Sequence, residues 1–496
     1  MAQTGVDTSP DPTRASGTFL SAIPRDFARD HGLLSQGDED GHEVLAVAPT
    51  TSPDAVWNVG VRLGRRVRTR EVEPEALHRA IDAAYERWSG QGTSETATES
   101  PAPPADDEDL DRLLADADRD LLATEGKAPL VRLLDRLLFG AVQMGASDLH
   151  LQPTPSSVLI RHRVDGVLDP GRPVPQGLFK ALVGRIKVIG RMDVAERLVP
   201  QDGRTSLRIG ERSIDVRIST IPTAYGERVV LRLLDSGSQL LDMPALGMPA
   251  HIVAPFANAA GRSSGIVLVT GPTGSGKTTT LYATLRSLQA TELNIMTIED
   301  PIEYELSSLG IPISQSQVNP KKGVNFANGL RHILRQDPDV IMVGEIRDAE
   351  TARIAIQASL TGHLVFSTLH TNDAVTAVTR LVDLGVEPYL VASSLTAILA
   401  QRLVRTCCAA CGGKRRIEDA PCPTCHGTGY KGRTGLFELL TIDEPLRGAI
   451  TRSAGLDELR TLARNGGMRS LGEEGAALMA AGRTTADEVE RVVHHG

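Results

Sequence analysis

An apolar run, a glycine-rich loop and a helical segment follow one another directly near the middle of the sequence. Residues 266–270 (Ile-Val-Leu-Val-Thr) are typical of a buried strand, and residues 279–288 are typical of a helix. In that setting the loop offers inward-pointing backbone N–H groups and a positive helix end, which together bind phosphate. A chance glycine-rich turn is the alternative, and the flanking strand and helix count against it. The loop and first helical turn comprise Gly271, Pro272, Thr273, Gly274, Ser275, Gly276, Lys277, Thr278 and Thr279.

The loop carries the two side chains that a nucleoside triphosphate site needs. Lys277 can neutralise charge on the β- and γ-phosphates, and the Thr278 hydroxyl can bind Mg²⁺. We therefore expect an ATPase of the P-loop class that uses ATP and Mg²⁺. A nucleotide switch that binds without hydrolysis is a second hypothesis, and it is disfavoured by the carboxylates described next.

Three further apolar strands bring ionisable groups to the edge of the sheet where the loop lies. Residues 295–298 lead into Glu299, and residues 364–368 end close to His370. Strands that alternate with helices form a parallel sheet, and ligands bind beyond the carboxyl ends of its strands. A carboxylate in that place can bind Mg²⁺ or orient the attacking water. Any one of these residues could instead be an ordinary loop residue.

The third of these strands, residues 340–343, ends in Gly344 and Glu345. The usual second motif of P-loop proteins ends this strand in Asp, so the sequence departs from that pattern. Glu345 could hold Mg²⁺ through water, act as the general base, or do both. The sequence leaves open whether Glu299 or Glu345 is that base.

Four motifs in a fixed order resemble the secretion ATPases of type II secretion and type IV pilus systems, most closely those of type II secretion. They are the loop, the acidic box TIEDPIE (297–303), the second nucleotide motif LRQDPDVIMVGEIRD (334–348) and the histidine box LTGHLVFSTLHTND (360–373). Upstream, residues 147–150, 217–222 and 226–228 also fit, and the resemblance covers roughly residues 130–440.

The resemblance implies a homohexameric ring and specific roles for polar residues. Glu299 and Glu345 resemble the acidic residues that handle Mg²⁺ and water. His363 and His370 resemble sensors of the γ-phosphate or of a domain interface, and ordinary loop histidines are the alternative. Arg217 and Arg232 resemble arginines that reach the phosphates and stabilise charge in the transition state, and structural salt bridges are the alternative.

All five cysteines lie between residues 407 and 425. Four of them form two Cys-x-x-Cys pairs that are separated by ten residues, a pattern that suits tetrahedral Zn²⁺. Cys407 competes with its neighbour but lacks the two-residue spacing. Secretion ATPases carry a similar element, although its spacer is longer than the one in this chain. The predicted zinc ligands are Cys408, Cys411, Cys422 and Cys425.

The chain of 496 residues is long enough for several domains. The fold class that we expect is α/β and multidomain, with a RecA-like P-loop domain preceded by smaller α/β domains. The predicted parts are a disordered tail (1–17), a docking module (18–90), a flexible linker (91–109), a second α/β domain (110–243), the RecA-like ATPase domain (244–400) and a zinc-binding and helical region (401–496). In the docking module, residues 19–34 are predicted to be largely helical.

The sequence contains neither a secretory signal nor an apolar run of the ~18 residues that a membrane span requires. We expect a cytoplasmic motor that reaches the inner membrane through secretion platform proteins bound to the N-terminal module. A type IV pilus assembly ATPase is one alternative. A nucleic-acid translocating ATPase with a zinc ribbon is another, and the net charge of −9 and 3% aromatic residues count against nucleic acid as a partner.

Overall fold

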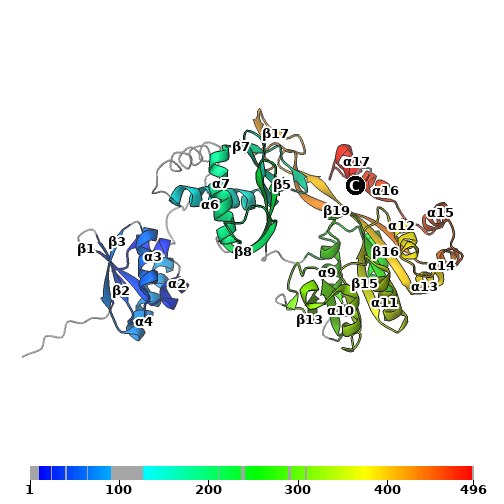
Figure 1. Cartoon of the computed structure of the whole chain (residues 1–496), viewed down its shortest axis with the longest axis horizontal. Helices are drawn as coiled ribbons and strands as arrows, with labels where there is room; N and C mark the ends of the chain where they lie inside the picture. Colours follow the sequence, from blue (N-terminus) through cyan, green and yellow to red (C-terminus); the bar gives the residue numbers. More distant parts are fainter. Residues whose placement is uncertain are drawn as a thin grey trace, which may run out of the picture. The chain divides into compact units, whose positions relative to one another are not determined.

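The computed structural model describes residues 10–23, 25–39, 42–63, 65–90, 127–209, 212–235, 241–288, 292–307 and 310–493. The chain divides into two compact units, residues 1–104 and 105–496. The predicted linker, residues 91–109, lies outside the described residues, as does much of the predicted tail. Helices and strands are mixed in both units, which confirms the α/β fold class (Figure 1).

The first unit is a three-stranded sheet with helices around its own apolar core. The strand order is β1-β2-β3, in which β1 is antiparallel and β3 parallel to β2. Leu33, Leu45 and Leu77 are fully buried in that core. The elements are α1 (Gly17–Ala22), α2 (Arg25–Asp30), β1 (Leu33–Glu39), β2 (His42–Val47), α3 (Pro53–Leu63), β3 (Arg66–Glu71) and α4 (Pro74–Gly90).

The helical prediction for residues 19–34 was wrong at its C-terminal end. The helix α2 stops at Asp30, and Leu33 and Leu34 begin β1. Gly32 has a φ of 58°, the left-handed conformation that glycine adopts readily and that ends helices.

The second unit begins with an antiparallel sheet covered by two helices. Its strand order is β6-β5-β4-β10-β9-β8, and β7 pairs with β5. Leucines of both helices fill the core on one face of this sheet. The elements are α6 (Lys127–Gln143), β4 (Ala146–Pro153), β5 (Val158–Val164), β6 (Val167–Leu168), β7 (Arg172–Val174), α7 (Gln176–Ile189), β8 (Gln201–Ile209), β9 (Arg212–Thr223) and β10 (Gly226–Asp235).

The sheet that carries the glycine-rich loop has the order β13-β12-β14-β15-β11-β16-β19, and only β19 is antiparallel to its neighbour. Alternate residues of β11 point into different cores: Ile266 and Leu268 into one, Val267 and Val269 into the other. Helices therefore cover both faces. The elements to residue 394 are α8 (Ala250–Ala260), β11 (Gly265–Thr270), α9 (Lys277–Ser287), β12 (Ile295–Glu299), β13 (Ile313–Gln317), η2 (Pro320–Lys322), α10 (Phe326–Ile333), β14 (Val340–Val343), α11 (Ala349–Leu360), β15 (Leu364–Leu369), α12 (Ala374–Asp383) and α13 (Pro388–Ser394).

This sheet continues past residue 400, where the sequence places a domain boundary. Residue 400 falls inside β16, and β16 pairs with β19 over most of its length. The remaining elements are β16 (Leu395–Cys407), β17 (Arg416–Ile417), β18 (Ala420–Pro421), β19 (Tyr430–Thr441), α14 (Glu444–Thr451), α15 (Leu456–Asn465), α16 (Leu471–Ala480) and α17 (Ala486–Val493). Among the described residues, we find no helix with the length and apolarity of a membrane span.

Candidate nucleotide site

The conformation of the loop after β11 depends on two glycines, Gly271 and Gly276. A larger residue at either position would strain the backbone or clash. Gly276 precedes α9 with a φ of 86°, a left-handed conformation that favours glycine. A Cβ atom on Gly271 would lie 2.4 Å from the carbonyl oxygen of Gln401 on β16. The loop can therefore turn tightly against β16 and keep its backbone N–H groups free to point into the cavity.

Two polar side chains of the loop are buried in a way that suits an anionic ligand. The Lys277 ammonium group donates hydrogen bonds to the carbonyl oxygens of Gly271 (2.8 Å) and Pro272 (3.0 Å). Burial lowers the pKa of Lys277 to about 8, although the nearby Glu345 carboxylate acts in the opposite direction. The Ser275 hydroxyl is buried and has no hydrogen-bond partner among the described residues. A phosphate group would satisfy both side chains.

Glu299 lies at the end of β12 and is held by three donors. Its carboxylate accepts hydrogen bonds from the hydroxyl groups of Tyr282 and Thr297 and, at 3.0 Å, from the amide of Gln315. Burial is the main reason that the pKa of Tyr282 is raised, and the Glu299 charge adds to it. With its oxygens occupied in this way, the Glu299 carboxylate is fixed in position at the wall of the cavity.

Glu345 follows β14 and faces the cavity with fewer partners. Its Oε2 atom lies 2.6 Å from Nε of Arg347, in an ion pair, and 3.4 Å from Nε2 of His370. Burial lowers the pKa of His370, and the positive charge of Lys277 lowers it further. A neutral His370 can exchange hydrogen bonds with water or phosphate beside this carboxylate.

One cavity of about 860 Å³ brings most of the predicted residues together. That volume falls in the range of small-molecule sites. Loop residues 272–279 line it, together with Glu299, Glu345, His370 and Arg232. Lysine, threonine and two carboxylates thus converge on one space, which is the donor set that Mg²⁺ and a triphosphate require.

The two arginines predicted to reach the phosphates occupy different places. Arg232 lines the cavity and pairs with Asp148, with 3.0 Å between Nε and Oδ1. Arg217 lies in a neighbouring cavity, where it pairs with Glu303 at 3.4 Å and donates to the Ile302 carbonyl. Both arginines make salt bridges here, so a role on phosphate stays a prediction and requires a change of partner.

His363 lies at the amino end of β15, at the opposite end of this strand from His370 and the loop. Its Nδ1 atom is 2.9 Å from the carbonyl oxygen of Ala358. Among the described residues, His363 does not line the 860 Å³ cavity. A direct γ-phosphate contact within this chain is therefore not supported, whereas a role at a domain interface stays a prediction.

Sequence patterns alone missed several residues of the cavity. Arg402 and Leu403 lie on β16, Arg433 on β19 and Arg491 on α17, and all four line it. None of them belongs to a nucleotide motif, and only the order of the strands brings them beside the loop. Arg347 carried a signal, since it stands two residues after Glu345.

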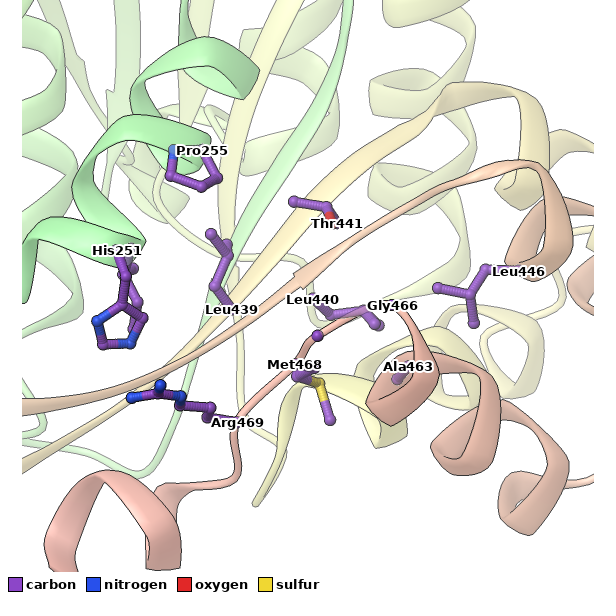
Figure 2. Close-up of a pocket in the computed structure, with 12 residues that line it drawn as sticks. His251, Pro255, Leu439, Leu440, Thr441, Leu446, Ala463, Gly466, Met468 and Arg469 are labelled. Carbon is purple, nitrogen blue, oxygen red and sulfur yellow. The ribbon is translucent and has the colours of Figure 1, made fainter. Parts of the chain in front are cut away.

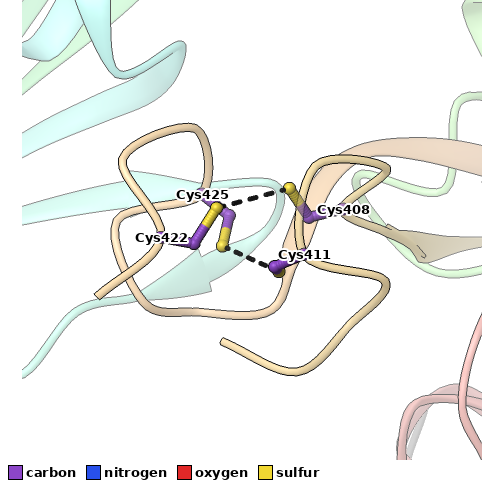
Figure 3. Close-up of side chains that lie close together, drawn as sticks. All are labelled: Cys408, Cys411, Cys422 and Cys425. Carbon is purple, nitrogen blue, oxygen red and sulfur yellow. Dashed lines mark hydrogen bonds between the residues drawn. The ribbon is translucent and has the colours of Figure 1, made fainter. Parts of the chain in front are cut away.

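The four predicted zinc ligands converge in a compact group (Figure 3). The Sγ atoms of Cys408 and Cys422 lie 3.9 Å apart, and those of Cys411 and Cys425 lie 3.8 Å apart. Four thiolates bound at about 2.3 Å to one Zn²⁺ would be separated by about 3.8 Å, the edge of that tetrahedron. The distances are too long for disulfides. The arrangement fits zinc, and Cys407 lies outside the group.

A second, smaller cavity of about 110 Å³ lies between α8, β19 and the turn after α15 (Figure 2). Polar and apolar groups both line it, and at one side His251 lies 2.8 Å and Arg469 lies 3.8 Å from the Glu474 carboxylate. This volume is too small for a nucleotide. The 860 Å³ cavity therefore remains the candidate nucleotide site.

The known sequences to which this chain is similar are secretion system proteins. A model of the family described as type II/IV secretion system protein matches residues 123–491. The type II secretion system protein HxcR of Pseudomonas aeruginosa is 47% identical over 480 residues, which span 95% of this chain and 99% of that protein. The type II secretion system ATPase E of Vibrio cholerae is 50% identical over 392 residues, which span 75% and 77%.

Solved structures share the fold of nearly three quarters of the chain. The pilus retraction motor PilT with bound ADP is 28% identical with a TM-score of 0.51, and the match covers 72% of this chain and 95% of that one. The ATPase DotB of Legionella pneumophila is 24% identical with a TM-score of 0.55, and covers 73% and 95%. One is named as an ATPase and the other as a motor. In each case the alignment covers 95% of the solved chain.

Proposed function

The chain belongs to the type II/IV secretion system protein family, and on that premise we propose that it hydrolyses ATP to drive type II protein secretion, by assembly of a pseudopilus at the inner membrane. The observation that carries this proposal is the single cavity shared by Lys277, Thr278, Glu299 and Glu345. Relatives named for type II secretion match along 95% of the chain, which favours that process.

We assign the general base to Glu345. Its carboxylate faces the cavity, and among the described residues it has an ion pair with Arg347 and a contact with His370, so one of its oxygens can orient a water and accept its proton. Glu299 is tied to three donors and acts as a fixed negative group of the wall. Mg²⁺, held by Thr278 and through water by Glu345, would neutralise charge on the phosphates when bound.

We expect the two arginines and His363 to act when the motor changes its conformation. Arg232 already lines the cavity, whereas Arg217 must leave Glu303 before it can approach phosphate. A homohexamer provides a second way to complete the site, because a neighbouring subunit can supply such groups across the interface. His363 at the far end of β15 suits a contact between domains or subunits.

The chain is proposed to work in the cytoplasm and to reach the inner membrane through platform proteins that bind the N-terminal unit. Zinc at the four cysteines is proposed to be structural, because four thiolates leave no coordination site open for chemistry. Pilus assembly is the second candidate function, and the likeness to a pilus retraction motor supports it. That relative is 28% identical, against 47% for a type II secretion protein, so secretion is preferred.

The test compares ATP hydrolysis and ATP binding in the unchanged chain, Glu345→Gln and Glu299→Gln, all with Mg²⁺. Loss of a general base costs about 10²- to 10⁴-fold in turnover. We expect that loss in Glu345→Gln with ATP affinity retained. Failure of the unchanged chain to hydrolyse ATP, alone or with the platform proteins, would refute the proposal. We also expect that Glu345→Gln does not restore secretion in a bacterial strain from which the gene for this protein has been deleted.

A further inference from the structure

The cavity has a second wall on the side of the loop away from the carboxylates. In the sheet order, the strands that deliver Glu299, Glu345 and His370 lie on one side of β11, and β16 and β19 lie on the other. The γ-phosphate must lie near the carboxylates and the water that attacks it. The ribose and base of the same nucleotide then extend to the opposite side, over β16.

Strand β16 runs past the end of β11 and flanks the loop along its length. The pairing of β11 with β16 ends at Thr270 and Ala400, and residues 401–407 of β16 continue beyond the end of β11. A Cβ atom on Gly276 would lie 2.9 Å from the Gln401 amide nitrogen and 3.6 Å from the Leu403 side chain. Leu403 thus presents an apolar surface at the point where the loop becomes α9.

The C-terminal helix α17 is fastened to this extension of β16 by buried ion pairs and hydrogen bonds. Glu488, whose side chain is fully buried, accepts hydrogen bonds from the backbone N–H and the guanidinium of Arg405. Buried Arg402, which lies beside the loop, donates to the carbonyl oxygen of Val492 at 3.3 Å. The helix is therefore held at a fixed place beside the nucleotide loop.

Arg491 projects from α17 at the edge of the cavity and is itself oriented by Glu488. Its Nη2 and Nε atoms lie 2.6 Å and 3.0 Å from the Glu488 carboxylate oxygens. Its side chain is 43% exposed and lines the cavity. A planar guanidinium, oriented by Glu488 and lining one cavity with Leu403 and Val492, is a surface on which an aromatic base can stack.

We propose that α17 forms the base-binding wall of the nucleotide site, with Arg491 stacked on the base and Leu403 and Val492 against its edge. This inference rests on the proposed function, since it requires a nucleotide on the loop. Stacking recognises the flat face that adenine and guanine share, so Arg491 contributes affinity and position and does not choose between purines.

The experiment compares two ligands on the full chain with Mg²⁺: ATP, and inorganic tripolyphosphate, which has no base. Dissociation constants are measured for the unchanged chain, for Arg491→Ala and for Arg464→Ala. Arg464 is a matched control, since it is an exposed arginine on α15 that does not line the described cavity. Tripolyphosphate is followed by displacement of radiolabelled ATP.

We expect Arg491→Ala to weaken ATP binding by roughly 3- to 30-fold, the range for a lost guanidinium–aromatic contact. Tripolyphosphate binding should stay within about twofold, and Arg464→Ala should change neither ligand. Equal weakening of ATP and tripolyphosphate would place Arg491 on the phosphates and overturn the inference, as would no change at all. If the unchanged chain bound neither ligand, the proposed function itself would fail.

Discussion

Lys277 donates hydrogen bonds to two carbonyl oxygens of its own loop, and burial lowers the pKa of its ammonium group to about 8. Phosphate charge would raise that pKa, so nucleotide binding takes up a proton wherever the free protein has lost it. ATP affinity should therefore be level below about pH 8 and fall up to about tenfold per pH unit above it. Dissociation constants measured from about pH 7 to 9.5 test this.

Lys277→Arg supplies the control for that pH profile. An arginine stays charged throughout this range, so whatever affinity the variant retains should not depend on pH. A profile that falls equally in both proteins would assign the titration to another group.

The two carboxylates of the cavity should differ in what they do for stability. Glu299 accepts hydrogen bonds from Tyr282, Thr297 and Gln315, and it is buried. In Glu299→Gln an NH₂ group takes the place of one carboxylate oxygen and cannot accept the hydrogen bonds of these donors. This loss should cost about 1–3 kcal/mol of unfolding free energy. Glu345→Gln loses contacts to the exposed groups of Arg347 and His370 and the attraction to Lys277, but it leaves no such set of buried donors unpaired, so it should cost less than Glu299→Gln.

Denaturant unfolding of the two variants and the unchanged chain measures this difference. Equal stabilities would mean that the hydrogen bonds of Glu299 rearrange freely, and its role as a fixed wall would be lost.

Among the elements, those with a local pattern were predictable and those defined by neighbours were not. The strands near residues 266, 295, 340 and 364 were visible because short apolar runs lead directly into polar residues. The length of β16 was not, since its pairing partner β19 begins only at Tyr430, beyond the cysteine cluster. For the same reason Arg402 and Arg491 could not be assigned to the site, because no spacing connects them to the loop.

The cysteine element should depend on the proposed zinc ion more than any other part of the second unit does. Strands β17 and β18 have two residues each, and their side chains are exposed, so the four buried cysteines are the core of this element. Zinc removal by a chelator or Cys422→Ser should abolish hydrogen-exchange protection at the backbone N–H groups of Cys408 and Cys422, which donate to Gly429 and Arg415.

Cys407→Ser is the matched control for that experiment, because this neighbouring thiol lies outside the cluster. It should leave one bound zinc per chain and unchanged exchange. Persistent protection in metal-free Cys422→Ser would show that the element folds without the ion.

The two compact units have separate apolar cores. Residues such as Phe19, Leu45 and Ile81 form the core of the first unit, and none of them belongs to the cores of the second unit. Because each unit has a core of its own, we expect each to unfold as its own cooperative unit. The residues proposed to bind nucleotide all lie in the second unit. Binding of ATP and docking to partners should therefore be separable.

Deletion of residues 1–90 should leave ATP affinity and the unfolding temperature of the second unit unchanged, because no residue of the nucleotide cavity is removed. The same deletion should abolish recruitment to membranes that contain the secretion platform, if the first unit is the docking module. Deletion of residues 1–9 alone, which removes none of the core residues named above, is the control and should keep recruitment. Sedimentation with such membranes and ATP titration of the three proteins measure both effects. If the protein without residues 1–90 is still recruited, the docking surface lies in the second unit. If that deletion lowers ATP affinity, the two units do not act independently.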